Sequence, residues 1–488
     1  MRFIYQLILL RFVSPKTLFL FFRAKRIHGN NLSFLLKLAA DRFGIKIAIA
    51  DEQRRLSFAE LHKKVAEISS WLKKNIIAED NATIILACSN SVSHIAFLHA
   101  IQNLGLKVIL VNHKAHTAEI NRIAGSISAP YYFFSSDTDH LLLPNAHNID
   151  DVFSDSNTAD SDFIPSKKHA PVIFPTSGTT GNAKLIEKRT GAFYWLRSFA
   201  HLSTNTGIYK RKAVYISIPV SHGFGYTALM FALVLGKKAI ITPNKNQQLV
   251  TELLLNEKTD LIAGVPSSLF QVAENLKGKQ HFVTLIISGG APLNEVAFKS
   301  ITENLTTNIY SMYGSTEAST SFIADYAMLK QNIHALGKPL KGVNYKLGAF
   351  TDGSKELLIQ SPLANLSTDE WLHSGDLADV DSNGILFWCG RKDNMILKNG
   401  VNIYPAEIEK AMHLLDGIED VHIAGEEDAL KGEIIIAYII TKAGFLFNEE
   451  QTRSQLAKSL PAIKIPDKIV RVQEFNYTST GKKVNPVL

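Results

Sequence analysis

Short apolar runs alternate with helix-like segments along the first two-thirds of the chain. Residues 83–87 and 108–111 are such runs, and residues 91–104 between them have the character of a helix. A strand, a helix and a strand at this spacing indicate a parallel sheet, because parallel strands need a long crossover connection. Further strand-like runs follow at residues 214–218, 239–241, 261–263, 285–287 and 308–310. This alternation predicts an α/β fold with layered, mostly parallel sheets and helices.

A capping box marks the start of an early helix. Ser57 is followed three residues later by Glu60, and Phe58, Leu61 and Val65 begin an apolar series with three- and four-residue steps. Each end of this pattern satisfies a backbone donor at a helix start. The pattern predicts an amphipathic helix over residues 58–74.

The length of 488 residues exceeds what one hydrophobic core supports, so we expect more than one domain. From about residue 390 the pattern changes to short strands at 421–424, 433–438 and 468–472, with helices at 404–415 and 449–459. We predict a large domain over 31–390 and a small, mobile α+β domain over 391–488. Residues 150–168, rich in Asp and Ser, are expected to form a surface linker.

The first 26 residues are apolar and their charges are all positive. Arg11, Pro15 and Lys16 interrupt the apolar run, so a transmembrane helix is not expected. The run is not followed by the small-residue cleavage site of a secretory signal, so such a signal is not expected either. Two interpretations of residues 1–30 stay open: helices packed on the body of the protein, or a basic apolar segment that contacts a membrane surface.

Composition excludes several classes of protein. Two distant cysteines, Cys88 and Cys389, exclude a disulfide framework and a cysteine-rich zinc site, and favour a cytoplasmic location. The sequence contains neither a His-x-x-x-His nor a Cys-x-x-Cys pattern, so a metal held by protein side chains alone is not expected. The net charge of +7 suits an anionic substrate, but no basic stripe with aromatic residues indicates nucleic acid binding.

A cluster of hydroxyl and glycine residues follows the apolar run at 171–174. Glycines let backbone N–H groups approach an anion, hydroxyls add donors, and a lysine adds a mobile charge. The cluster therefore predicts a loop that holds a polyphosphate, although its spacing is not that of the P-loop and a flexible loop is the alternative. Its residues are Thr176, Ser177, Gly178, Thr179, Thr180, Gly181 and Lys184.

Five more segments carry polar or glycine residues at or after predicted strands. They are residues 219–225, 288–293, 313–317, 371–376 and 390–409. Ligands of a parallel sheet bind beyond the carboxyl ends of its strands, so we expect several of these segments to meet in one crevice.

In these six segments, taken in order, the chain resembles the adenylate-forming superfamily of acyl-CoA synthetases, aryl-CoA ligases, luciferases and adenylation domains. The resemblance runs from residue 56 to residue 482. It implies an acid–thiol ligase of two steps: a carboxylate attacks the α-phosphorus of ATP to give acyl-AMP and pyrophosphate, and a thiol, most often that of CoA, then displaces AMP.

The resemblance also implies roles for individual residues. Thr316 would contact the α-phosphate, Glu317 would hold Mg²⁺, and Lys482 would bridge the carboxylate and the α-phosphate. Besides the phosphate loop, the nucleotide would contact Gly290, Ala291, Tyr313, Asp376 and Arg391. The acid pocket would be lined by His222, Phe224, Gly225, Val265, Ser288, Gly289, Met312 and Gly314. Their apolar or small side chains favour a fatty or aryl acid.

A hinge at Asp393 would let the small domain rotate between the two steps. The loop of Lys398, Asn399 and Gly400 would then approach the thiol. Several positions depart from the family's pattern: Ala183 stands in place of proline, Leu185 in place of glycine, and Asn399 in place of glycine. Asparagine still tolerates a left-handed backbone.

Simpler interpretations exist for single residues. Asp376 fits a turn, Glu317 fits the first turn of a helix, and His222 fits a structural loop histidine. For the whole chain we keep two other functions open: an acyl-AMP ligase that loads the phosphopantetheine of a carrier protein, and a nucleotide-binding protein without turnover.

Overall fold

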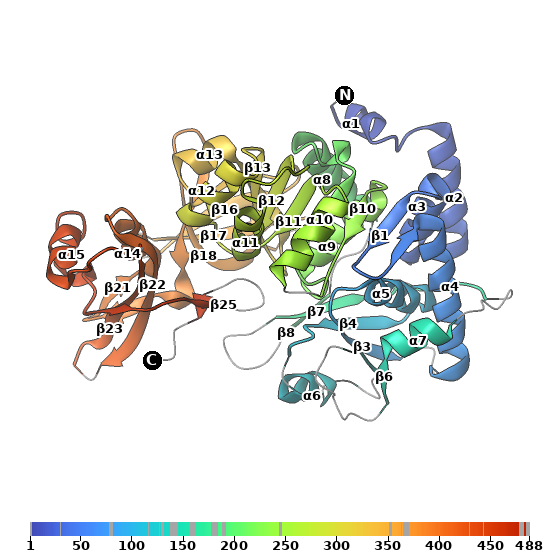
Figure 1. Cartoon of the computed structure of the whole chain (residues 1–488), viewed down its shortest axis with the longest axis horizontal. Helices are drawn as coiled ribbons and strands as arrows, with labels where there is room; N and C mark the ends of the chain where they lie inside the picture. Colours follow the sequence, from blue (N-terminus) through green and yellow to red (C-terminus); the bar gives the residue numbers. More distant parts are fainter. Residues whose placement is uncertain are drawn as a thin grey trace.

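The computed structural model describes residues 2–29, 31–77, 82–115, 117–125, 127, 131–136, 145–156, 163–176, 184–187, 192–243, 246–350, 354–362, 364, 370–428, 430–442, 444–477 and 483–484. Figure 1 shows an α/β protein in which the strands of the last hundred residues gather in a separate, smaller unit at one end of the molecule. The predicted fold class is confirmed.

The larger of two extended sheets runs in the order β16-β17-β18-β19-β15-β14-β13-β12-β11-β9-β10-β1-β2. The strands β1, β10, β9, β11, β12 and β13 pair with one another in parallel. Strand β2 pairs with β1 in the antiparallel sense, and all pairs from β13 and β14 to β17 and β16 are antiparallel. The bounds are β1 Ile47–Ala50, β2 Arg55–Ser57, β9 Ala213–Ile216, β10 Lys238–Ile240, β11 Leu261–Gly264, β12 Leu285–Gly289, β13 Ile309–Ser315, β14 Ser319–Asp325, β15 Ala335–Pro339, β16 Asn344–Ala349, β17 Lys355–Gln360, β18 Leu372–Val380 and β19 Leu386–Arg391.

A second sheet has the order β6-β5-β3-β4-β7-β8 and is parallel except at β8. Its strands are β3 Thr83–Ala87, β4 Lys107–Val111, β5 Tyr131–Phe134, β6 Ala146–Asn148, β7 Val172–Thr176 and β8 Lys184–Glu187. The strands expected at 83–87 and 108–111 are therefore confirmed as parallel neighbours.

The helix α5 (Val92–Leu104) is buried on all sides, and its buried residues include the polar Ser93, His94, His99, Gln102 and Asn103. The helix predicted at 58–74 is α4 (Phe58–Asn75), and both bonds of its capping box are present. One continuous core contains side chains of both helices and both sheets. The other helices of the large unit are α3 Ser33–Phe43, α6 Thr117–Gly125, α7 Ile149–Asp155, α8 Ala192–Asn205, α9 Gly223–Val234, α10 Gln247–Asn256, α11 Pro266–Leu276, α12 Glu295–Asn304 and α13 Tyr326–Gln331.

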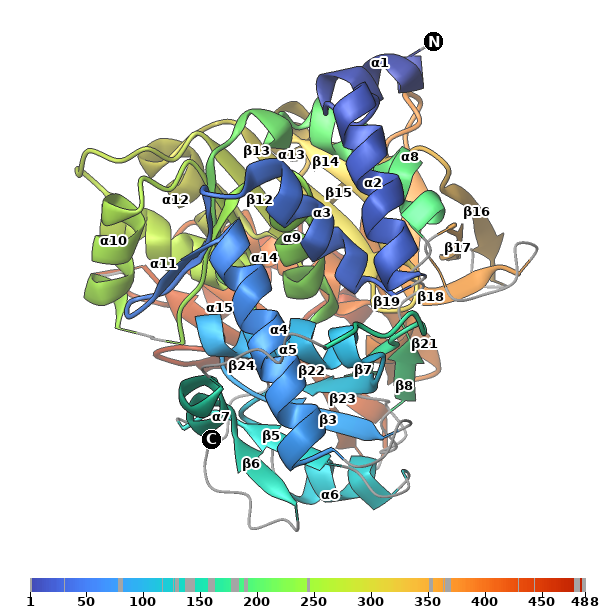
Figure 2. The ribbon, with the colours of Figure 1, turned by 90° about the vertical axis from the view of Figure 1, so that its right-hand side faces the viewer.

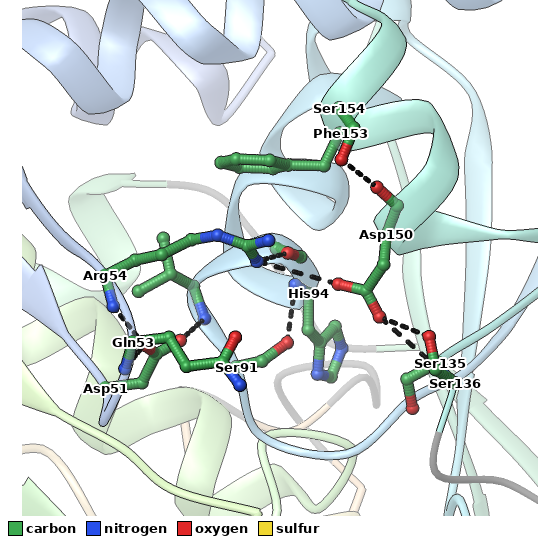
Figure 3. A network of polar contacts seen from close by, with 12 residues as sticks. Asp51, Gln53, Arg54, Ser91, His94, Ser135, Ser136, Asp150, Phe153 and Ser154 are labelled. Carbon is green, nitrogen blue, oxygen red and sulfur yellow. Dashed lines mark hydrogen bonds and ion pairs between the residues drawn. The ribbon is translucent and has the colours of Figure 1, made fainter.

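A polar network joins the two sheets (Figure 3). The Asp51 carboxylate, just after β1, accepts the backbone N–H groups of Arg54 and Val92, the latter at the start of α5. The Arg54 guanidinium donates to Ser93 and lies 3.6 Å from the carboxylate of Asp150 in α7. These contacts fix the first hairpin of the larger sheet to helices of the second layer.

The expectation of a linker over residues 150–168 is wrong for its first part. Residues 149–155 form α7, capped by the Asn148 side chain, and Ile149 and Val152 are buried. Carboxylates at 150 and 151 favour the positive end of a helix, so acidic residues there stabilise a helix as well as a loop. Within the described part, residues 163–168 have no regular structure, but the Ser166 backbone N–H donates to the Asn103 carbonyl.

The smaller unit contains a sheet of order β21-β20-β23-β22, with β24 on β23. Its elements are β20 Ile396–Lys398, β21 Val401–Ile403, α14 Pro405–His413, β22 Ile418–Asp428, β23 Gly432–Thr441, α15 Glu449–Leu456 and β24 Lys468–Arg471, followed by the pair β25 Asn476–Tyr477 and β26 Lys483–Val484. Strand β19 belongs to the large sheet and β20 to the small one, so the chain passes between the sheets through residues 392–395. This passage supports our proposed boundary near residue 391.

The amino terminus forms two helices, α1 (Arg2–Leu9) and α2 (Pro15–His28), both packed on the large unit. The Gln6 side chain donates to Thr204 in α8, and Leu20 and Ala24 pack with Phe34 of α3. Among the described helices, none is long and apolar enough to cross a membrane.

Candidate active site

The carboxyl ends of four parallel strands bring the predicted acid-pocket residues together. Gly264 at the end of β11 is opposite Ser288 of β12, and Gly289 is opposite Met312 of β13. The segment after β9 contributes residues 217–225, which lead into α9. The residues that were expected to line one crevice therefore lie at the same edge of the sheet.

Two glycines bring the Phe224 side chain and the end of β12 into direct contact. A Cβ atom on Gly289 would lie 2.9 Å from the Phe224 ring, and one on Gly290 would lie 3.3 Å from the Val265 side chain. Gly290 also has a φ of 83°, in the left-handed region. Phe224, Val265 and the glycine pair therefore form one apolar surface that a larger side chain at 289 would disrupt.

Two other pocket candidates have local roles. The Nδ1 atom of His222 accepts a hydrogen bond of 3.4 Å from the Phe224 N–H and caps α9. Ser288 is completely buried, so its hydroxyl does not reach solvent in this arrangement. His222 thus has the structural function that the simpler interpretation gave it, next to the apolar surface.

Tyr313 and Asp376 come from strands that are far apart in the sequence and meet side chain to side chain. The Tyr313 hydroxyl donates to the Asp376 carboxylate at 2.5 Å. Burial, the negative charge of Asp376 and this hydrogen bond raise the pKa of Tyr313 well above its ordinary value. The phenol is thus a neutral donor that fixes the carboxylate.

Two more donors hold the other oxygen of Asp376. The indole Nε1 of Trp388 donates at 3.1 Å and the guanidinium of Arg391 lies at 3.4 Å. Asp376 lies inside β18, which excludes the interpretation as a turn residue. Gly375 has a φ of 70°, and a Cβ atom there would lie 2.8 Å from the Arg391 guanidinium, so glycine permits this approach.

Trp388 is a residue that the sequence analysis missed. It is in β19, which pairs with β18 across a bulge, so that Asp376 is opposite Arg391 and Ala378 is opposite Trp388. No spacing rule predicts such a register before the pairing is known. Only the tertiary structure places the indole on the carboxylate.

Thr316 and Glu317 lie in the tight turn between β13 and β14, in which Ser315 pairs with Ser319. No helix begins there, so the interpretation of Glu317 as a helix-start residue is wrong. The turn continues directly from Tyr313. It therefore places Glu317 at the end of β13 that carries the Tyr313–Asp376 contact.

The phosphate loop lies mostly outside the described residues. Thr176, which ends β7, is paired with Lys184, which begins β8, so the two ends of the loop are neighbours in an antiparallel pair. Residues 177–183, which include Ser177, Gly178, Thr179, Thr180, Gly181 and Ala183, are not described. Lys482 is also outside the described residues, although its neighbour Lys483 binds the Asp420 carboxylate at 2.6 Å.

The predicted hinge residue lies between the two sheets. Asp393 accepts a hydrogen bond of 2.8 Å from the Arg391 guanidinium. Burial lowers the pKa of Arg391, but the hydrogen bond to Asp393 and the charge of Asp376 outweigh it and raise this pKa. Arg391 therefore links the Asp376 cluster to the connection that leads into the small unit.

The predicted thiol loop is the β20–β21 hairpin. Asn399 and Gly400 have φ angles of 50° and 75°, the pattern of a two-residue hairpin turn in which asparagine replaces glycine without difficulty. The Lys398 ammonium is buried and bound to Asp467 at 2.7 Å. Lys398 thus anchors the hairpin, while Asn399 and Gly400 form its exposed tip.

Comparisons with known proteins agree with this geometry. The model of the AMP-binding enzyme family matches residues 36–354, and that of the AMP-binding enzyme C-terminal domain matches residues 407–482. The chain belongs to the AMP-binding enzyme family. These enzymes form the adenylate-forming superfamily that the sequence motifs indicated.

Several relatives share most of the length of this AMP-binding enzyme. The 2-succinylbenzoate–CoA ligase of Listeria innocua is 24% identical over 460 residues, which cover 89% of this chain and 94% of the relative. That of Staphylococcus epidermidis is 24% identical over 474 residues, covering 92% and 96%. The fold matches o-succinylbenzoate CoA synthetase from Bacillus subtilis with an acyl-adenylate, with a TM-score of 0.78, 21% identity and coverage of 92% and 96%.

Proposed function

We propose that this enzyme joins a carboxylic acid to CoA, with cleavage of ATP to AMP and pyrophosphate and with acyl-AMP as the intermediate. The observation that carries the proposal is the cluster in which Tyr313, Trp388 and Arg391 all contact the Asp376 carboxylate at the carboxyl edge of the sheet. A carboxylate held in this way is positioned to accept hydrogen bonds from the two hydroxyl groups of a ribose.

In the first step an oxygen of the acid's carboxylate bonds to the α-phosphorus of ATP, and the bond to pyrophosphate breaks. Asp376 would hold the ribose, Tyr313 would lie against the adenine beside Gly290 and Ala291, and Thr316 would contact the α-phosphate. Lys482 would reduce the repulsion between the two anions that react. The loop between Thr176 and Lys184 would hold the β- and γ-phosphates.

The residues also fit a magnesium ion. Within the described residues no cluster of three His, Cys, Asp or Glu side chains could hold a metal alone. One carboxylate, that of Glu317, combined with phosphate oxygens suits the way in which Mg²⁺ is usually held. The ion would neutralise charge on the phosphates.

In the second step the sulfur of CoA bonds to the acyl carbon, and the bond between this carbon and AMP breaks. We propose that the small domain turns about Asp393 between the steps, so that Lys482 leaves the site and the Asn399–Gly400 tip enters it. The direct contact between Arg391 and Asp393 supports this role, because it couples the nucleotide cluster to the hinge.

The acid itself is inferred from the pocket. The apolar surface of Phe224, Val265 and Met312, with glycines at 225, 289 and 314, suits an aryl or fatty chain. The names of the relatives favour an aryl acid of the 2-succinylbenzoate kind, so this compound is the first to test. A fatty acid is the second candidate, favoured by the apolar amino-terminal helices.

Two finer points of the proposal concern the acceptor and the location. CoA is the acceptor in the names of the relatives, and a carrier-protein phosphopantetheine is the alternative because it presents the same thiol. We infer a cytoplasmic location, where ATP and CoA are available, in contact with a membrane surface.

The test is acid-dependent release of pyrophosphate from Mg²⁺-ATP, measured for 2-succinylbenzoate, other aryl acids, fatty acids and amino acids, with and without CoA. We expect release with an aryl or fatty acid and a thioester only when CoA is present. Release that stops at bound acyl-AMP despite CoA would favour a carrier protein. Binding of ATP without release for any acid would contradict the proposal.

A further inference from the structure

The outer sides of α1 and α2 expose large apolar side chains. Along α1, Ile4, Tyr5 and Ile8 are 56–62% exposed, and along α2, Phe19 and Phe22 are each 66% exposed. The spacings of one, three and four residues place each group on one side of its helix. Together with Val13 and Leu18 these residues form what we call the amino-terminal face: Ile4, Tyr5, Ile8, Val13, Leu18, Phe19 and Phe22.

The two helices are fixed to the large domain, both through the segment of residues 10–14 that connects them and through the end of α2. Phe12 stacks on Phe199 of α8 at 6.0 Å, and the Arg42 guanidinium donates to the carbonyl groups of Leu10 and Arg11. On α2, the His28 ring bonds to Ser33 at 2.7 Å. The outward apolar side chains are therefore carried by an anchored pair of helices on the outside of the molecule (Figure 2).

Every charge on this segment is positive. Arg2, Arg11, Lys16, Arg23, Lys25 and Arg26 are its ionised residues, and the first acidic residue of the chain is Asp41. Exposed Lys16, Arg23 and Arg26 lie on the same helix as Phe19 and Phe22. Such a combination of aromatic and basic residues suits the boundary between anionic headgroups and acyl chains.

A small hollow beneath α1 adds to this positive charge. Phe3 and Gln6 of α1 form one side, and Arg197 and His201 of α8 with Lys341 form the other. Arg197 and Lys341 are exposed, and the Arg197 guanidinium lies 5.9 Å from the Phe3 ring. The hollow thus offers two further cations beside the apolar face, in reach of a negatively charged headgroup.

We propose that the amino-terminal face docks this enzyme on a membrane that contains anionic lipids. A second copy of the chain fits the face less well, because a twofold interface would bring the lysine and arginine side chains of α2 against their own copies. An anionic lipid surface complements both the apolar side chains and the charges. This inference concerns where the enzyme works, and its test needs neither acid nor ATP.

The experiment is co-sedimentation of the full chain with sucrose-loaded vesicles, either phosphatidylcholine alone or with one-third phosphatidylglycerol. We expect binding to the anionic vesicles that weakens as salt is raised. Phe19→Glu with Phe22→Glu should reduce the affinity by roughly 100-fold, because two apolar anchors are lost. Lys16→Gln with Arg26→Gln should reduce it by about 25-fold, at about fivefold per charge.

Matched controls separate docking from general effects. Leu414→Glu with Leu446→Glu removes exposed apolar residues of the small unit, and Lys277→Gln with Lys279→Gln removes exposed charges far from α1 and α2. Both should bind vesicles like the unaltered chain. All variants should keep their Tm and their pyrophosphate release with a water-soluble acid, since none of these side chains lies in the candidate active site.

Absence of binding to anionic vesicles would overturn the proposal, as would equal binding of the Phe19/Phe22 variant. Sedimentation as a dimer that the Phe19/Phe22 variant dissociates, without vesicle binding, would also overturn it and identify the face as a contact between copies. A chain that docks but releases no pyrophosphate would contradict the proposed reaction and leave the docking intact.

Discussion

The Asp376 cluster and the β20–β21 hairpin differ in how firmly their functional groups are held. The Asp376 carboxylate is only 13% exposed and contacts three donors from two strands, β13 and β19. The hairpin is held at its base by Lys398 and Asp467, but its tip, Asn399 and Gly400, is exposed. The cluster that we propose for nucleotide binding is thus held by several hydrogen bonds, whereas the tip of the proposed acceptor loop presents exposed residues and, within the described part of the chain, only its Asn399 N–H is bonded, to the Lys431 carbonyl. Preorganisation favours the step in which charge must be stabilised, and an exposed tip suits a loop that is proposed to move.

The largest effect should follow loss of the Asp376 carboxylate. Asp376→Ala removes the proposed ribose acceptor, leaves the Tyr313 hydroxyl without its acceptor and leaves Arg391 with Asp393 alone, so pyrophosphate release should fall by about 100-fold or more in kcat/KM for ATP. Asp379→Ala, on the same strand but exposed and bound to Lys355, should change it little. Equal activity of both variants would mean that the cluster is only structural.

Loss of the Lys398–Asp467 pair at the base of the hairpin should lower the free energy of unfolding more than it slows the reaction. Burial raises the pKa of Asp467, but hydrogen bonds from Lys398, Lys431 and the Ile435 N–H outweigh burial and lower it to about 2, from an ordinary value of 3.8. Lys398→Met should cost about 1–3 kcal/mol in the free energy of unfolding, because it removes a charged hydrogen-bond donor from this carboxylate. Thermal unfolding of the two chains measures this difference.

The pH dependence of this pair follows from the lowered pKa of Asp467. A carboxylate whose pKa is lower in the folded than in the unfolded chain stabilises the fold fully above its unfolded pKa, and loses this contribution as pH falls. The stability difference between Lys398→Met and the unaltered chain should therefore be constant above about pH 5 and shrink as the pH is lowered toward 2. A difference that grows on acidification would show that Lys398 acts through another group.

Loss of the Trp388 indole donor should have a moderate effect on activity, smaller than loss of the Asp376 carboxylate itself. Trp388→Phe keeps the aromatic packing and removes one donor to Asp376, so the KM for ATP should rise by roughly tenfold while formation of thioester from supplied acyl-AMP changes less. Trp371→Phe is the matched control, since Trp371 packs against Lys346 instead. An unchanged KM would show that Tyr313 and Arg391 are enough to position the carboxylate.

The smallest effect should be found at the hairpin tip. Gly400 has a φ of 75°, and no atom lies within 4 Å of an added Cβ, so Gly400→Ala strains the backbone without a collision. A cost of about 1 kcal/mol predicts a thioester step about fivefold slower, with pyrophosphate release unchanged. Slower release with an unchanged thioester step would reverse the roles that we give to the cluster and the hairpin.

Local patterns of the sequence were sufficient to predict many helices and strands and to identify the family. The capping box at Ser57 and Glu60 predicted α4, and the apolar run at 83–87 predicted β3, because both signals depend on neighbours along the chain. The same kind of signal failed at residues 149–155, where acidic and small residues were taken as a linker although Ile149 and Val152 anchor a helix. Composition does not distinguish a loop from a short helix whose buried residues are few.

The sequence by itself determined the residue types that the chemistry needs and their order: a carboxylate at 376, a phenol at 313, a guanidinium at 391 and an asparagine–glycine turn at 399–400. Only the tertiary structure decided which of them touch. The bulged register between β18 and β19 brings Trp388 to Asp376, and the fold of the small sheet turns Lys398 inward to Asp467. Pairing between distant strands depends on the packing of the whole sheet, so no short stretch of sequence contains it.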